Sequence, residues 1–312
     1  TQVSCRASFG QLAAHPAFEQ VFNRSRSGSS MVLLAALSFV VAFLVALLVI
    51  RRVRGHAGRY GYAKPQRFHV GDVPRLGGLA IFLGLFFGLI AAVVAFYADN
   101  TGFLHISGMV MAGWMCTLLP ALAGGVVEDL TQRLPVVYRL VLTSLSAALA
   151  LLLMDVGVVR LGLPFLDTAL GMVPWLGLVL AFVAITGLPH AFNIIDGYNG
   201  LAGMVALAVC LALTYVALQV GDRQLAGVLV CLTGATAGFL VWNYPRGLIF
   251  AGDGGAYVWG VCLAVASLLL VHRNEQVSPW FPMLLLIYPV WETLFSIYRK
   301  LMRGTSPSVA DA

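Results

Sequence analysis

Charged side chains are scarce in this sequence of 312 residues. Asp, Glu, Lys and Arg make up 10% of it, hydrophobic residues make up 60%, and the mean hydropathy is +0.90. These values exclude a soluble globular chain, in which about 25% of residues are charged. They predict an all-α, polytopic integral membrane protein. We expect no nucleic-acid partner.

Cysteine and histidine are also few, and neither shows the spacing of a metal site. Cys5 lies in the polar N-terminal stretch, and the other four cysteines lie in long apolar runs. The six histidines include no His-x-His pair. Neither residue type therefore predicts a metal-binding motif.

Long apolar runs account for most of what the sequence does contain. A membrane-spanning helix needs roughly 20 mainly apolar residues. Nine runs approach this length, at about 31–50, 76–97, 104–123, 140–154, 172–188, 201–220, 225–242, 256–271 and 280–297. The third run carries Gly and Thr and the fourth is short, so a re-entrant or buried segment is the alternative for these two.

Lys and Arg are unevenly distributed between the loops. Thirteen of the 19 fall in loops on one side if the first run crosses from outside to inside. The positive-inside rule then predicts an outer N-terminus and an inner C-terminus. Residues 1–30 are polar and Met31 opens directly onto an apolar run, so we expect a disordered extension at 1–30 and a single transmembrane domain at 31–312.

Four acidic residues from three loops fall on this inner side, and each lies beside glycines. They are Glu128, Asp129, Asp196 and Asp253. Glycine lets a backbone approach a ligand closely, and an acidic residue at a membrane span indicates a functional site by default. For any single acid, the alternative is a helix cap.

Crowded carboxylates repel one another unless a cation neutralises them. Oxygen ligands without Cys or His favour Mg²⁺ or Mn²⁺, and Mg²⁺ commonly completes its shell with water and phosphate oxygens. A phosphorylated substrate is therefore expected. Arg75 lies at the start of the second run and Arg246 seven residues before Asp253, and both are suited to phosphate. Anchoring to anionic lipid is the alternative for the basic loops.

Four motifs occur in the order seen in one family. They are Val73–Gly78, Gly125–Leu130 followed by Arg133 and Arg139, Asn193–Leu201, and Gly252–Ala256. Together they resemble the polyprenyl-phosphate N-acetylhexosamine-1-phosphate transferases, the WecA-like and MraY-like membrane enzymes of bacteria. The resemblance covers about residues 31–310.

The resemblance implies an enzyme that transfers N-acetylhexosamine-1-phosphate from a UDP-sugar to undecaprenyl phosphate and releases UMP, with Mg²⁺ or Mn²⁺. It places the active site at the cytoplasmic face of a bacterial inner membrane, where the product would begin a cell-envelope polysaccharide such as O-antigen. By position, it assigns catalysis to Asp129, Glu128 and Asp253, the metal to Asp253 and Asp196, and substrate to Asn193, Asp196, Asn199, Arg246 and Arg75.

Two departures from the family pattern stand out. Glu128 occupies a position where the family usually has aspartate, and the residues from Ser306 onward replace an expected histidine-rich loop and further helix. We therefore expect this C-terminal segment to be lacking. A transporter or flippase of a phosphorylated or lipid-linked substrate is one alternative, because transporters also break helices at polar, glycine-rich points. An inactive homologue is the other, and the sugar and oligomeric state, a homodimer included, are left open.

Overall fold

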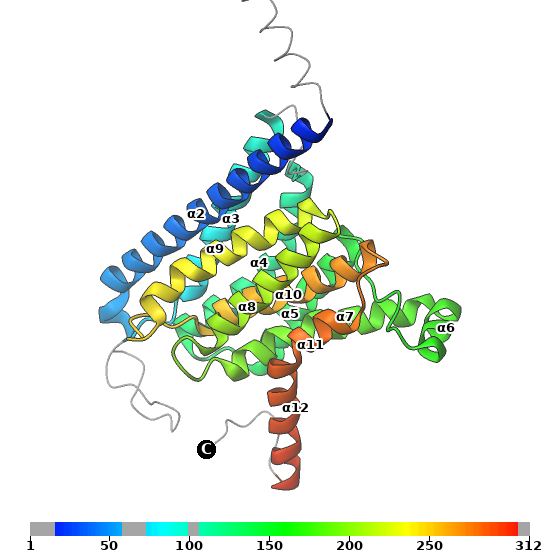
Figure 1. Cartoon of the computed structure of the whole chain (residues 1–312). Coiled ribbons are helices and arrows are strands. Elements are labelled where there is room, and N and C mark those ends of the chain that lie inside the picture. Colours follow the sequence, from blue (N-terminus) through cyan, green and yellow to red (C-terminus); the bar gives the residue numbers. More distant parts are fainter. Residues whose placement is uncertain (1–15, 58–72, 99–105, 305–312) are drawn as a thin grey trace, which may run out of the picture.

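The computed structural model describes residues 16–57, 73–98 and 106–304, and every regular element in these ranges is a helix (Figure 1). The helices are α2 (Pro16–Ala57), α3 (Gly77–Ala98), α4 (Gly108–Thr131), α5 (Val136–Leu153), α6 (Pro164–Met172), α7 (Pro174–Ile195), α8 (Leu201–Gln219), α9 (Arg223–Asn243), α10 (Gly252–Arg273), α11 (Trp280–Leu285) and α12 (Ile287–Met302). The predicted all-α class is confirmed for the described part of the chain.

Eight of these helices are long and apolar enough to cross a membrane: α2, α3, α4, α5, α7, α8, α9 and α10. They coincide with the first eight predicted runs. The third and fourth runs form continuous helices of 24 and 18 residues, so neither has the break of a re-entrant segment. The polytopic architecture follows directly from the apolar pattern.

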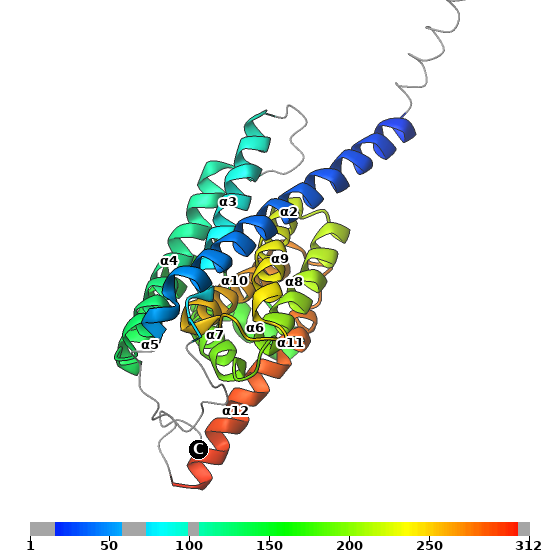
Figure 2. The ribbon, with the colours of Figure 1, turned by 90° about the vertical axis from the view of Figure 1, so that its left-hand side faces the viewer.

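The ninth predicted span, 280–297, is wrong as a single helix. The chain forms the short α11 and then α12, which meet at Leu286. Pro289 explains the break, because proline has no N–H to donate and its ring would collide with the carbonyl of Leu285 in a continuous helix. Helix α12 leaves the bundle at an angle in both views (Figure 1 and Figure 2).

The N-terminal boundary also differs from the expectation. Helix α2 begins at Pro16, so it includes the second half of the stretch 1–30 for which we expected disorder. Residues 1–15 lie outside the described residues, as does the segment after Gly304 that bears on the expected lack of a histidine-rich loop.

Helix α10 lies at the centre of the bundle (Figure 2). In its apolar stretch 89% of residues are buried, against 28% in α2 and 22% in α5. It packs against α3, α4, α7 and α8. Gly260 allows the close approach to α7, because a β-carbon there would overlap the backbone of Pro189. Because other helices surround α10, the side chains of its first turn are held in fixed positions.

Candidate functional site

Backbone hydrogen bonds join two of the sequence motifs at one end of the bundle. Phe250 N–H donates to the Pro74 carbonyl, Gly77 N–H to the Phe250 carbonyl and Gly78 N–H to the Ala251 carbonyl, each at 2.9 Å. The segment that precedes α3 therefore runs beside the segment that precedes α10. This pairing places Arg75 next to the first turn of α10.

Glycines allow three helices to meet at this point. A β-carbon on Gly78 of α3 would overlap the backbone of Gly254 and Gly255, and one on Gly125 of α4 would overlap Gly254 and Asp253. Gly252 has φ +69°, a left-handed conformation that favours glycine, and a β-carbon there would meet the Asp129 carboxylate. Gly125 and Gly252, which lie near acidic residues in the sequence, are thus required by close packing.

Asp129 caps the first turn of α10. Its Oδ1 accepts from the Asp253 N–H and its Oδ2 from the Gly254 N–H, both at 2.9 Å. These N–H groups have no partner within the helix, and a negative charge is favourable at the positive end of the helix dipole. The buried carboxylate therefore fixes the position of α10 relative to α4.

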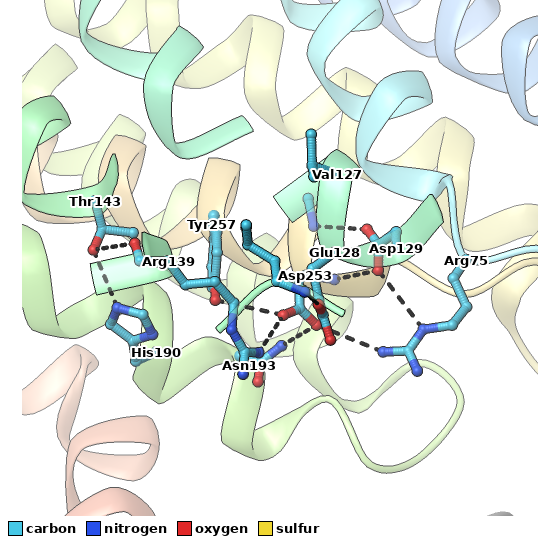
Figure 3. Close-up of polar contacts among 12 residues, drawn as sticks. Arg75, Val127, Glu128, Asp129, Arg139, Thr143, His190, Asn193, Asp253 and Tyr257 are labelled. Carbon is cyan, nitrogen blue, oxygen red and sulfur yellow. Dashed lines mark hydrogen bonds and ion pairs between the residues drawn. The ribbon is translucent and has the colours of Figure 1, made fainter. Parts of the chain in front are cut away.

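Asp253 collects side chains from four elements (Figure 3). Its Oδ2 accepts from Arg139 Nη1 at 2.9 Å and from the Tyr257 hydroxyl at 3.4 Å. Its Oδ1 accepts from Asn193 Nδ2 at 2.8 Å and lies 3.5 Å from Arg75 Nη2. Residues far apart in the sequence thus converge on one carboxylate, as the common side of their loops predicted.

The two aspartates and two arginines balance in charge, but they differ in exposure. The side chains of Asp129 and Asp253 are 1% and 5% exposed, whereas that of Arg75 is 42% exposed. Arg139 is intermediate at 22%. Buried carboxylates persist when paired, and Arg75, which also lies 3.7 Å from Asp129 Oδ1, is the member most open to solvent.

Asp196 lies just beyond the end of α7 and is half-buried. Burial raises the pKa of Asp196 to about 7, with Arg75 acting in the opposite direction and the negative charge of Asp253 adding to the rise. Asp196 therefore shares the electrostatic environment of Asp253 without being one of its direct partners.

Two asparagines connect the Asn193–Leu201 motif to the loop before α10. Asn243 Oδ1 accepts from the Gly200 N–H at 2.7 Å, and its Nδ2 donates to the Ile249 carbonyl at 2.8 Å. Asn199 Nδ2 donates to the Pro245 carbonyl at 3.2 Å. The predicted substrate residues Asn199 and Arg246 thus lie on adjoining loops, where Arg246 is exposed and neither contacts Asp253 directly.

Glu128 and Asp129 are adjacent but have different environments. Asp129 points inward to α10, whereas Glu128 Oε2 accepts from the Leu134 N–H at 2.8 Å. This bond closes the turn between α4 and α5. The structure thus gives Glu128 a contact in the loop that positions Arg139.

The donor chemistry of the site is compatible with one hard cation. Among the described residues, no group of three or more His, Cys, Asp or Glu side chains is arranged to hold a metal. Asp253 Oδ1 nevertheless accepts a single hydrogen bond, on the side where Arg75 is exposed, so it keeps lone-pair capacity. Mg²⁺ binds in this way, through one or two carboxylates completed by water and substrate phosphates.

Sequence reasoning did not name Arg139 and Tyr257 as site residues. Arg139 was part of a matched motif, and its place at the start of an apolar run beside the acidic loop was an available signal. Tyr257 follows Asp253 by four residues, which places the two on one helix face. Its hydroxyl contact could not be inferred, since most tyrosines in an apolar helix are packing residues.

Comparison with known proteins shows which family the chain belongs to. A decaprenyl-phosphate N-acetylglucosaminephosphotransferase of Mycobacterium tuberculosis is 28% identical over 297 residues, covering 84% of this chain and 69% of its own. A protein of Bacillus subtilis described as a probable undecaprenyl-phosphate N-acetylglucosaminyl 1-phosphate transferase is 26% identical over 280 residues, covering 87% and 74%. The model of glycosyl transferase family 4 matches residues 110–271, which span α4 to α10 and include Asp129, Arg139, Asn193 and Asp253, and the chain belongs to this family.

Proposed function

We propose that the protein transfers N-acetylglucosamine-1-phosphate, or a related N-acetylhexosamine-1-phosphate, from a UDP-sugar to undecaprenyl phosphate. The observation that carries this proposal is the convergence of Arg75, Arg139 and Asn193 on Asp253 at the first turn of α10. The names of the relatives favour N-acetylglucosamine and a polyprenyl phosphate acceptor. The product would begin a cell-envelope polysaccharide, such as O-antigen.

The reaction depends more on bringing the two negatively charged substrates together than on a general base. An oxygen of the lipid phosphate attacks the β-phosphorus of the UDP-sugar, the bond from that phosphorus to the bridging oxygen breaks, and UMP leaves with the electron pair. A phosphate monoester has its second pKa near about 6, so the nucleophile is mostly dianionic at neutral pH. Positioning and electrostatic stabilisation therefore supply most of the catalysis.

The residues present can perform these tasks. Arg75 is exposed beside the two aspartates, so its guanidinium can leave Asp253 and pair with a phosphate. Arg139 and Asn193 hold the Asp253 carboxylate in one orientation. A Mg²⁺ ion, for which we expect Mn²⁺ to substitute, would neutralise phosphate charge, with Asp253 and Asp196 as its protein ligands. Asn199 and Arg246, on the adjoining loops, would contact the nucleotide-sugar.

The membrane topology accommodates the two substrates. Eight helices are long and apolar enough to span the bilayer, and the site lies at the helix ends, where a lipid phosphate and a water-soluble nucleotide can meet. We place this end at the cytoplasmic face of a bacterial inner membrane, because ten Lys and Arg residues lie in or beside the loops that join the eight helices on this side, against three on the other.

The test is UMP release by the purified protein from undecaprenyl phosphate and a panel of UDP-sugars, with and without Mg²⁺. We expect release with UDP-N-acetylglucosamine that depends on the metal, and a loss of about 100-fold or more in Asp253→Asn. Glu128→Gln, which keeps an acceptor for Leu134 N–H, separates this loop contact from the catalytic role that the resemblance assigns to the charge of Glu128. Absence of UMP with every sugar, or undiminished turnover in Asp253→Asn, would overturn the proposal.

A further inference from the structure

A second layer of polar side chains lies one helical turn deeper in the bundle than the Asp253 site. On α5 the deeper residue follows Arg139 by four positions, on α10 it follows Asp253 by four, and on α7 it precedes Asn193 by three. These spacings place each pair on one helix face. The three deeper residues are Thr143, His190 and Tyr257.

The deeper residues are in contact with one another and with the site (Figure 3). The Tyr257 hydroxyl donates to Asp253 Oδ2 at 3.4 Å. The rings of Tyr257 and His190 meet edge to face, with centroids 5.2 Å apart. His190 Nε2 lies 3.1 Å from Thr143 Oγ1. The chain of contacts therefore runs from Asp253 back to the helix that carries Arg139.

The hydrogen bond between Thr143 and His190 is coupled to the contacts that the threonine makes with its own helix. The Thr143 hydroxyl lies 3.0 Å from the Leu140 carbonyl and 3.2 Å from the Arg139 carbonyl, and it has one hydrogen to donate to them. When the hydroxyl donates to one of these carbonyls, its oxygen accepts from His190, and the imidazole then carries its proton on Nε2. A fixed tautomer in turn fixes the orientation of the ring against Tyr257.

We propose that Thr143, His190 and Tyr257 are positioning residues that hold the Asp253 carboxylate in its reactive orientation. With both Arg139 and Tyr257 on Oδ2, rotation of the carboxylate is restrained, and Oδ1 stays turned toward Arg75. Without the tyrosine hydroxyl, Arg139 is the one hydrogen-bond donor left to Oδ2, and the Asp253 carboxylate can rotate more freely. The proposal rests on the function proposed above, since it assigns a task to the same carboxylate.

Tyr257→Phe separates positioning from packing, because it removes the hydroxyl and keeps the ring. We expect kcat for UMP release to fall about tenfold, with KM for the UDP-sugar changed by less than about twofold. This is the effect expected of a residue that orients a metal-binding carboxylate without itself contacting the substrate. Mn²⁺ binding by the purified protein without substrates, measured by titration calorimetry, should weaken by about tenfold. The temperature of thermal unfolding should stay within a few degrees of that of the wild type.

The His190 position supplies an independent pair of variants. His190→Gln keeps an N–H donor that can reach Thr143, whereas His190→Leu removes it. We expect His190→Gln to retain most of the wild-type kcat and Mn²⁺ affinity, and His190→Leu to lose about tenfold of each. Because His190 acts through Tyr257, adding His190→Leu to Tyr257→Phe should cause little further loss.

Wild-type kcat and Mn²⁺ affinity in Tyr257→Phe would overturn the proposal, as would equal losses in the two His190 variants. Failure of the wild type to release UMP would refute the proposed function alone, because Mn²⁺ binding still reports the orientation of Asp253. If Tyr257→Phe fails to fold, the comparison of His190→Gln with His190→Leu decides the question.

Discussion

The dual hydrogen bond from α10 to Asp129 predicts a specific cost for removing one carboxylate oxygen. In Asp129→Asn, the single amide oxygen can accept from Asp253 N–H or from Gly254 N–H, but not from both. The amide NH₂ then faces the other N–H, donor against donor. The site is buried, so water does not satisfy the group that loses its partner.

The size of the effect follows from these contacts. A buried donor left without an acceptor costs about 1–3 kcal/mol. Loss of the negative charge at the start of α10 adds up to about 1 kcal/mol, whereas relief of repulsion between Asp129 and Asp253 offsets part of it. We expect a net destabilisation of about 2 kcal/mol, which corresponds to a fall in Tm of roughly 4 °C for a chain of this size.

Thermal unfolding in detergent, followed by tryptophan fluorescence, measures the Tm shift, and UMP release measures the effect on the site. Asp129→Asn should lower both, because Asp253 is carried on the turn that Asp129 caps. Gly187→Ala, where a β-carbon meets nothing within 4 Å, should change neither appreciably. An unchanged Tm in Asp129→Asn would refute the capping argument, and unchanged UMP release would show that the position of α10 does not control the reaction.

Three further predictions concern other parts of the site. Arg139→Met should reduce UMP release by about 100-fold, and Arg139→Lys should recover part of it, because a point charge replaces one partner of Asp253; equal rates would contradict this. Burial raises the pKa of Asp196 from 3.8 to about 7, so protonation is favoured in the folded protein and stability falls as pH rises through this range. The Tm of Asp196→Asn relative to the wild type should thus increase between pH 5 and pH 7, and a constant difference would refute the assignment. Gly125→Ala should cost about 1–3 kcal/mol by overlap with the backbone of α10, measured as lower Tm against Gly187→Ala, where a β-carbon meets nothing within 4 Å.

The sequence allowed the convergence of the acidic loops to be predicted, because the alternation of spans places every second loop on one side. Asp129, Asp253 and Asn193 accordingly meet. The roles of Arg139 and Tyr257 were not predictable in the same way. They depend on the rotation of α5 and α10 about their own axes, which tertiary packing determines. The surfaces of these helices are almost uniformly apolar, so the sequence does not indicate which face points toward the site.

The break at Leu286 shows a similar limit for the fold. Hydropathy averages over a window, so residues 280–297 score as one apolar run. Pro289 acts locally through its missing N–H and its ring, and proline is also tolerated inside continuous spans such as α4 and α7, at Pro120 and Pro189. The effect of a proline depends on whether neighbouring helices satisfy the freed groups, which is a property of the assembled bundle.

The central place of α10 has a consequence for biogenesis. During synthesis the helices enter the membrane in chain order, so α3 to α9 are present before α10 is made. Until then Asp129 lacks the N–H groups that satisfy it, which belong to residues 124 and 125 positions further along the chain. The earlier helices therefore reach their final packing only after α10 has been made, because α3, α4, α7 and α8 all pack against it.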